Sequence, residues 1–314
     1  MTELAGALTA MAIGVVGTST IHLSKGVMRL GMSRLRSEEA SKRRASAIYT
    51  TGILMNFTNP FWVILANRFA PTVFYTSMYG LGLLSLLLFS RYKLDEKLSS
   101  SQYLGIVVIV GGTLLVGFGN LVGGKPSLYG ANTGFLITVA VLWLVLTPTL
   151  ALLLRRGKIG IQEFYFGLAA GGLAALEAMV KGVSQAGEFS NTFLPQSSFT
   201  WWLFVMSFLG AAGAFAMIQW SYLRRCRASM MGTIYDVAYV TMPLLLTASI
   251  VEGASLGGWK LGGVTVLIVG VLMVGAGGPR RASAPNPDCV IPEPTKSVST
   301  PTLTFETKDL RGDT

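Results

Sequence analysis

The chain has 314 residues, of which 51% are hydrophobic and only 13% are charged, and its mean hydropathy is +0.56. A soluble protein of this length would need far more charge to cover its surface, so the composition excludes a soluble globular protein. The net charge of +10 does not indicate nucleic-acid binding, because the basic residues lie in short loops between apolar segments.

Nine apolar blocks follow one another along the chain, each close to the roughly 20 residues that a helix needs to cross a bilayer. We therefore predict an all-α, polytopic membrane protein whose transmembrane domain covers residues 1–278. The composition then changes, and residues 279–314, rich in Pro, Ser and Thr, predict a disordered tail. The nine predicted spans are residues 4–24, 46–67, 71–90, 102–123, 132–154, 162–186, 200–222, 228–250 and 258–278.

The basic residues alternate between the predicted loops. The even-numbered loops hold only Arg68, Lys125 and Lys260, whereas every odd-numbered loop is basic. Under the positive-inside rule this pattern places the N-terminus outside and the tail in the cytoplasm. The basic residues of the odd loops are Lys25, Arg29, Arg34, Arg36, Lys42, Arg43, Arg44, Arg91, Lys93, Lys97, Arg155, Arg156, Lys158, Arg224, Arg225 and Arg227.

Two stretches of the chain resemble each other. In each, an acidic turn, at Glu96 and at Glu252, is followed by a Gly-rich apolar helix. Five spans separate the two turns, and an odd number gives the copies opposite orientations. The pattern predicts inverted structural repeats, an architecture that recurs in transporters. The alternative is that any two membrane hairpins look alike at this level.

Charged groups inside a span cost about 3 kcal/mol each, so each needs a reason. Glu177 and Lys181 are four residues apart, which places them on one face of a helix. They form either an internal ion pair that serves packing or a switchable pair whose carboxylate a cation or proton frees.

Asp236 is the second acidic residue inside a span, between Tyr235 and Tyr239. No basic residue lies within a turn of it, so its partner must come from another helix, from water or from a bound cation. A protonated Asp236 hydrogen-bonded to a neighbour is the alternative. Pro243 in the same helix should free a backbone carbonyl.

The second span carries Asn56, Asn59 and the helix breaker Pro60. The two amides could supply oxygen ligands to a hard cation such as Mg²⁺, or could form an interhelical hydrogen bond. The only histidine, His22, is interpreted as an interface residue at the cytoplasmic end of the first helix.

No pattern of residues indicates an enzyme or a cofactor. The sequence has no Ser or Cys nucleophile beside a base, no phosphate-binding Gly loop and no HExxH motif. Its two cysteines, Cys226 and Cys289, have no metal-ligand spacing.

Several short motifs carry a family resemblance. Residues 94–98, LDEKL, with the Gly-rich helix after them and Glu252 in the second half, resemble the acidic turns of the drug/metabolite transporter superfamily. Nine helices are similar to the branch of NIPA-type magnesium transporters. Further similarities to that branch are residues 24–29 (SKGVMR), 69–71 (FAP), Lys181, and 222–223 (YL) followed by 228–229 (AS).

The resemblance covers about residues 5–278 and implies alternating access and transport of Mg²⁺. One departure affects this implication. The branch has an intramembrane Gly-Glu pair where this chain has Asn59-Pro60, and a Pro-Leu-Gly run where it has residues 77–79, SMY. The carboxylate of that pair is therefore absent.

Three functional hypotheses follow. In the first, a divalent cation binds Asp236, Glu177, Asn59 and Asn56, with Lys181, Glu96 and Glu252 in supporting roles. In the second, the chain exports or exchanges a small organic solute, with Tyr235 and Tyr239 lining the pocket and Asp236 binding a proton or an amine. In the third, it is a membrane scaffold whose tail recruits partners. We expect the lipid bilayer as surroundings and no nucleic acid, and homodimerisation stays open.

Overall fold

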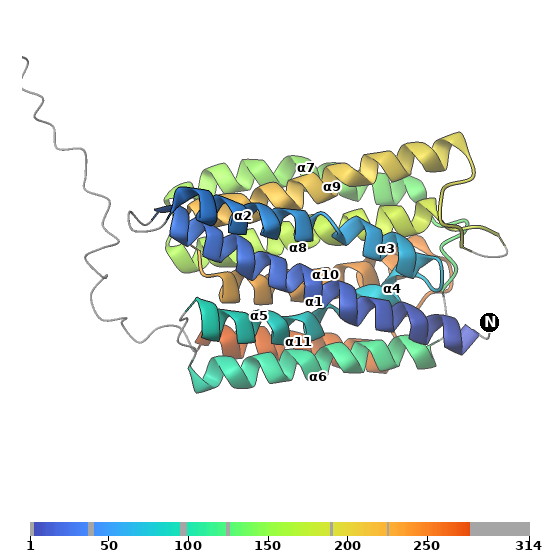
Figure 1. Cartoon of the computed structure of the whole chain (residues 1–314). Helices are drawn as coiled ribbons and strands as arrows, with labels where there is room; N and C mark the ends of the chain where they lie inside the picture. Colours follow the sequence, from blue (N-terminus) through green and yellow to red (C-terminus); the bar gives the residue numbers. More distant parts are fainter. Residues whose placement is uncertain are drawn as a thin grey trace, which may run out of the picture. The chain divides into compact units, whose positions relative to one another are not determined.

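A computed structural model describes residues 3–36, 41–94, 99–123, 126–188, 191–224 and 226–276, and these form helices and no strand (Figure 1). The predicted tail and Glu96 lie outside the described residues. The helices are α1 (Glu3–Arg36), α2 (Lys42–Asn56), α3 (Asn59–Asn67), α4 (Thr72–Thr76), α5 (Tyr79–Lys93), α6 (Ser100–Val122), α7 (Thr133–Leu153), the 3-10 turn η1 (Leu154–Arg156), α8 (Ile159–Ser184), α9 (Ser198–Leu223), α10 (Ala228–Ile250) and α11 (Gly258–Ala276).

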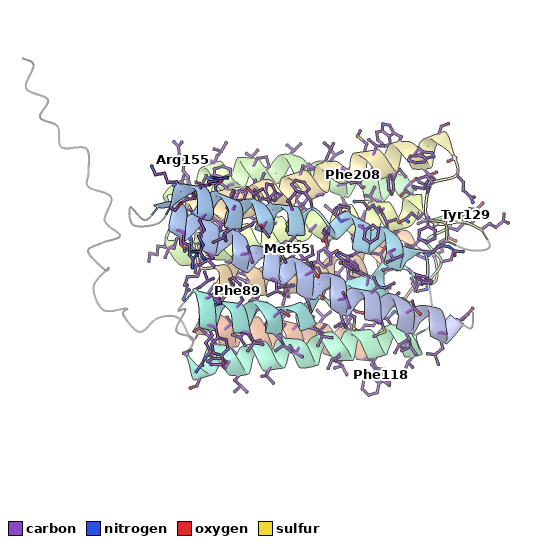
Figure 2. All side chains as sticks on the ribbon, in the orientation of Figure 1. Met55, Phe89, Phe118, Tyr129, Arg155 and Phe208 are labelled. Atoms are coloured by element: carbon purple, nitrogen blue, oxygen red, sulfur yellow. The ribbon has the colours of Figure 1, made fainter. Side chains whose placement is uncertain are left out.

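Seven helical stretches are long and apolar enough to cross a membrane: α1, Thr72–Lys93, α6, α7, α8, α9 and most of α10. Large apolar side chains project outward along the helices, among them Phe118 on α6 and Phe208 on α9 (Figure 2). Such a surface suits lipid rather than water. The chain is therefore an all-α, integral, multi-pass membrane protein, as its composition predicts.

The helices differ strongly in how far they are buried. In α8, 94% of the most apolar window is buried inside the protein, whereas in α7 the share is 17%. Helices α7 and α9 pack on α8, α6 pairs with α11, and α1 and α10 lie between these two groups (Figure 1). The inner helices α1, α8 and α10 carry most of the buried charged residues, and Lys260 lies in α11.

Two of the predicted spans are interrupted. Phe57 and Thr58 separate α2 from α3 within the predicted span 46–67, and Ser77 and Met78 separate α4 from α5 within 71–90. The first break fits its sequence, because Pro60 lies in the first turn of α3, where a helix tolerates a residue without an N–H. The second break comes directly before Tyr79.

Glycines allow α6 and α11 to approach closely. A Cβ atom added at Gly112 would lie 2.9 Å from the Leu267 nitrogen and 3.0 Å from the Gly263 oxygen. The neighbouring Gly111 faces outward, and a Cβ there would meet nothing within 4 Å. Adjacent glycines of one helix thus have opposite surroundings.

We predict that Gly112→Ala and Gly111→Ala change the free energy of unfolding differently: the first should lower it and the second should not. Gly112→Ala should lower the free energy of unfolding by about 1–3 kcal/mol, because backbone atoms of α11 must move. Gly111→Ala should be neutral or raise it by about 0.5–1 kcal/mol, because alanine is the better helix former. Unfolding of both variants in detergent, titrated with SDS, measures the difference, and equal effects would show that α6 and α11 do not pack through Gly112.

Candidate functional site

Asp236 of α10 is fully buried and is held by His22 of α1. The Nε2 atom of His22 lies 2.8 Å from Oδ1 and 2.7 Å from Oδ2 of Asp236, and both residues are 0% exposed. Because no basic residue lies within one helical turn of Asp236, its partner was expected to come from elsewhere. His22 is that partner, 214 positions away on another helix.

The other ring nitrogen of His22 fixes how many protons the pair holds. Nδ1 lies 2.7 Å from the carbonyl oxygen of Thr18, which can only accept a hydrogen bond, so Nδ1 carries a hydrogen. The contact between Nε2 and the Asp236 carboxyl group then needs one further proton. That proton makes the pair either imidazolium with carboxylate or imidazole with carboxylic acid.

Lys25 places an ammonium group beside the same carboxyl group. Its Nζ atom lies 3.9 Å from Asp236 Oδ1 and 3.4 Å from the centroid of the Tyr235 ring. It donates no hydrogen bond to any residue that the structure describes, although it is 1% exposed. The positive charge is therefore stabilised by the carboxyl group and by the face of an aromatic ring.

Three tyrosines, which we call the tyrosine cluster, enclose this group: Tyr79 of α5 with Tyr235 and Tyr239 of α10. The ring centroids of Tyr79 and Tyr239 are 4.0 Å apart, and those of Tyr79 and His22 are 4.9 Å apart. All three tyrosines are buried. The predicted site residues Tyr235, Tyr239 and Asp236 thus lie together, at the contact of α1, α5 and α10.

Glycines are needed where these helices meet. A Cβ atom at Gly82 of α5 would lie 2.3 Å from His22 Nδ1 and 2.7 Å from the Thr18 oxygen. A Cβ atom at Gly171 of α8 would lie 2.3 Å from the backbone carbonyl oxygen of Tyr235. Each glycine therefore sets the position of a helix that carries a site residue.

Glu177 and Lys181 form a second buried pair, as their spacing predicts. Lys181 Nζ donates a hydrogen bond to Glu177 Oε1 within α8 and lies 4.2 Å from the centroid of the Phe208 ring. Glu177 Oε2 accepts no hydrogen bond from a described residue. The positive charge of Lys181 offsets the carboxylate charge inside a single helix.

The two amide residues that the sequence singled out lie with Glu177 around a small cavity of about 40 Å³. Asn56, Asn59, Glu177 and Tyr235 all line it. Asn59 Oδ1 accepts a hydrogen bond of 3.3 Å from the Tyr75 hydroxyl, and Asn56 Oδ1 accepts one of 3.4 Å from Ser24. Asn56 thus joins α2 to α1 and Asn59 joins α3 to α4, which is the interhelical role that the sequence left open.

Other predicted groups lie elsewhere. Glu252 is exposed at the end of α10, outside the group around Asp236. Within the part of the chain that the structure describes, no three His, Cys, Asp or Glu side chains are grouped closely enough to hold a metal ion.

The interpretation of His22 and Lys25 is corrected by their burial. His22 was expected at the membrane interface and Lys25 in the first loop, but α1 continues to Arg36 and both are inside the protein. The basic residues after position 24 looked like the start of a loop. The signal that could have found them is their spacing, because Thr18, His22 and Lys25 recur every three to four residues along one helix face.

A further buried acid was missed near the N-terminus of α8. Glu163, 1% exposed, accepts hydrogen bonds of 2.9 and 3.0 Å from the Arg227 guanidinium group and one of 2.8 Å from the Arg227 backbone N–H. It holds the connection between α9 and α10 against α8. Nearby, burial raises the pKa of the Cys226 thiol to about 12, so this cysteine is protonated at neutral pH.

No protein-family model, no curated protein and no solved structure matches this chain. The candidate site therefore rests on the contacts around Asp236, and its function is argued from their chemistry.

Proposed function

We propose that the chain is a secondary transporter of small organic amines that exchanges its substrate for a proton at Asp236. The observation that carries the proposal is the position of Lys25. Its ammonium group lies against a buried carboxyl group and an aromatic face, and these are the partners that an organic ammonium ion would use. A substrate amine would displace Lys25 from this place.

The shared proton supplies the coupling in this proposal. The His22–Asp236 pair holds one proton in addition to the hydrogen on Nδ1. A cationic amine that binds beside Asp236 brings a positive charge into the site in addition to that of Lys25, and this added charge favours loss of the shared proton. Binding of the amine would then be coupled to release of the proton, as the exchange of one for the other requires.

The proposal extends to the architecture. We propose nine spans, formed by the seven long helical stretches together with α2–α3 and α11, in two inverted halves that work by alternating access. The N-terminus would lie outside and the tail in the cytoplasm. The resemblance to the drug/metabolite transporter superfamily implies the same arrangement, and the breaks between α2 and α3 and between α4 and α5 are typical of helices at a substrate site.

A divalent cation is less well supported as the substrate. Asp236 already has His22 and Lys25 as partners, and Glu177 has Lys181. A hard cation such as Mg²⁺ needs several oxygen ligands, and here it would compete with these fixed positive groups. The sequence departure at Asn59, where the magnesium branch has a carboxylate, points in the same direction.

Exchange is tested in proteoliposomes that contain a pH dye and have a more acidic interior. Tetraethylammonium is the probe, because its permanent charge prevents it from carrying protons through lipid by itself. We expect its addition to raise the internal pH in proteoliposomes but not in protein-free liposomes. A Mg²⁺ reporter is loaded in a parallel sample. A Mg²⁺ signal without a change in pH would support the cation hypothesis instead, and no signal from folded protein would support the scaffold hypothesis.

Lys25→Met provides a sharper test of the site. If Lys25 competes with the substrate, its removal should tighten tetraethylammonium binding about tenfold, since a desolvated cation–π contact is worth about 1–2 kcal/mol. Isothermal titration of the detergent-solubilised protein measures the dissociation constant. Lys158→Met, the same change at an exposed position, is the control and should bind like the wild type. Weaker binding by Lys25→Met would show that Lys25 only stabilises the fold.

A further inference from the structure

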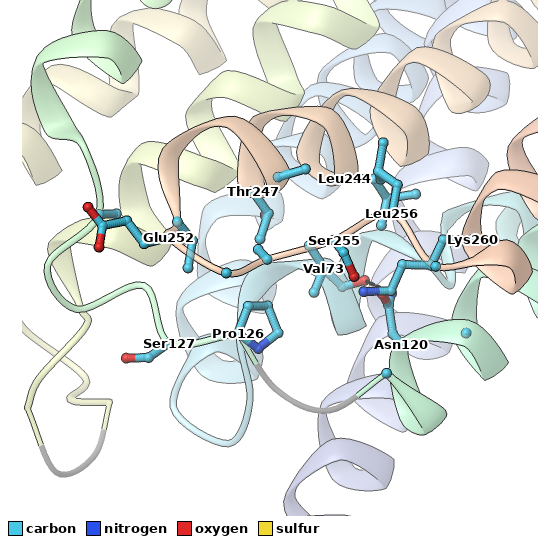
Figure 3. A pocket seen from close by; sticks show the side chains of 18 of the residues that line it. Val73, Asn120, Pro126, Ser127, Leu244, Thr247, Glu252, Ser255, Leu256 and Lys260 are labelled. Carbon is cyan, nitrogen blue, oxygen red and sulfur yellow. Dashed lines mark hydrogen bonds between the residues drawn. The ribbon is translucent and has the colours of Figure 1, made fainter.

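A second pocket, unrelated to Asp236, opens at the end of the bundle where α6, α10 and α11 meet. Its volume is about 780 Å³, within the range of roughly 300–1,000 Å³ that is usual for small-molecule sites. Residues of the connections 126–131 and 251–257 complete its wall (Figure 3). The residues of interest are Asn120 at the end of α6 and Lys260 at the start of α11.

Lys260 brings a buried positive charge to this pocket. The sequence placed it in a loop, but it lies in the first turn of α11 and is only 9% exposed. Its side chain runs over two glycines of the α6 end, because a Cβ atom at Gly119 would lie 3.0 Å from Lys260 Cγ and one at Gly123 would lie 3.4 Å from Nζ. Among the described residues, Lys260 Nζ has neither a hydrogen-bond acceptor nor an ion-pair partner.

The start of α11 adds further hydrogen-bond donors. Gly257 precedes the helix and has no side chain that could cap it, and its carbonyl oxygen accepts from the N–H groups of Lys260 and Leu261. The N–H groups of Gly258 and Trp259 donate to no described residue. Free amides and the helix dipole favour a negative group at this end of a helix.

Asn120 contributes a buried acceptor. Its Nδ2 atom donates a hydrogen bond of 3.1 Å to the Val73 oxygen, so its Oδ1 atom remains as the acceptor. Oδ1 accepts no hydrogen bond from a described residue, although Asn120 is 1% exposed. A buried acceptor without a donor is costly, and a ligand with a donor group would satisfy it.

Glu252 is the other charged residue of the pocket lining, and it does not neutralise Lys260. It is exposed, it forms no ion pair with a described residue, and its carboxylate points away from Lys260 in Figure 3. From the residues that the structure describes, the buried part of the pocket therefore receives one positive charge, the free amides of α11 and one free acceptor.

We propose that this pocket binds a small organic acid with a hydroxyl or ammonium group on the carbon next to its carboxylate. The carboxylate contacts Lys260 and the first amides of α11, and the neighbouring donor contacts Asn120 Oδ1. The inference goes beyond the proposed exchange of amines and does not depend on it, because no residue is shared with the site at Asp236.

Binding to the purified full-length chain in detergent is measured by isothermal titration with four related probes. 3-Phenyllactate carries the carboxylate and a hydroxyl, phenylalanine carries the carboxylate and an ammonium group, 3-phenylpropionate lacks the donor, and 3-phenyllactamide lacks the charge. We expect 3-phenyllactate or phenylalanine to bind, and the stronger of the two identifies the donor. 3-Phenylpropionate should bind about tenfold more weakly and 3-phenyllactamide not at all.

Four variants complete the test. Lys260→Met should abolish binding, Lys260→Arg should retain it, and Lys158→Met, at an exposed position outside the pocket lining, should leave it unchanged. Asp236→Asn should also bind the acid normally, which separates this pocket from the exchange site. The proposal is overturned if the amide binds as well as the acid in the wild type, a comparison that needs no variant. It is also overturned if no acid binds to folded wild type or if folded Lys260→Met binds with unchanged affinity.

Discussion

Asp236→Asn is expected to abolish exchange of tetraethylammonium and to lower the free energy of unfolding by about 3–5 kcal/mol. The substitution removes the carboxyl group between His22 and Lys25 and leaves the Lys25 ammonium group buried without its acidic partner. Loss of one partner of a buried pair is costly for this reason. The internal pH of proteoliposomes reports the exchange, and SDS titration in detergent reports the stability.

The double variant Asp236→Asn/Lys25→Met separates the two effects. Removing both charges should recover at least half of the lost stability, because an uncharged pair of similar volume has no buried charge to stabilise. Exchange should remain absent, because the group that binds the proton and the amine is gone. A stable double variant that still exchanges amine for protons would contradict the assignment of Asp236.

Glu177→Gln is the second change with a large expected effect. It leaves Lys181 in the interior of α8 with only the Phe208 ring beside it, so we expect a loss of about 3–5 kcal/mol in the free energy of unfolding. Glu177→Gln/Lys181→Met should recover most of this loss. The same SDS titration measures both variants.

Transport by that double variant decides between the two roles that the sequence left open for the pair. We expect exchange to continue, because the pair neutralises itself within one helix and the proposed coupling belongs to His22 and Asp236. A double variant as stable as the wild type but without exchange would instead assign the Glu177 carboxylate to the transport cycle. Exposed Glu252→Gln is the control for removal of a carboxylate as such.

The sequence predicts the features that are local and fails for those that join distant segments. Apolar blocks predict the helices because the length needed to cross lipid is fixed, and the spacing of Glu177 and Lys181 predicts their contact because it depends on one helix alone. The partner of Asp236 leaves no such pattern, since His22 lies 214 positions away. Lys25 and Lys260 were assigned to loops because a basic residue near the end of an apolar block looks the same whether it is buried or solvated.

The two interrupted spans place one helical hairpin between two non-helical breaks. Helices α3 and α4 lie between the break at Phe57 and Thr58 and the break at Ser77 and Met78. Hydrogen bonds from Asn67 to Gln185 and from Thr72 to the Ala178 oxygen hold this hairpin to α8 and the residue that follows it. Rotation of the hairpin with loss of these hydrogen bonds would carry Asn59, with its donor Tyr75, away from the small cavity beside Tyr235, while α2 and α5 kept their places. Opening of that cavity would thus confine the backbone change to the few residues of the two breaks, as hinged motions in other proteins do.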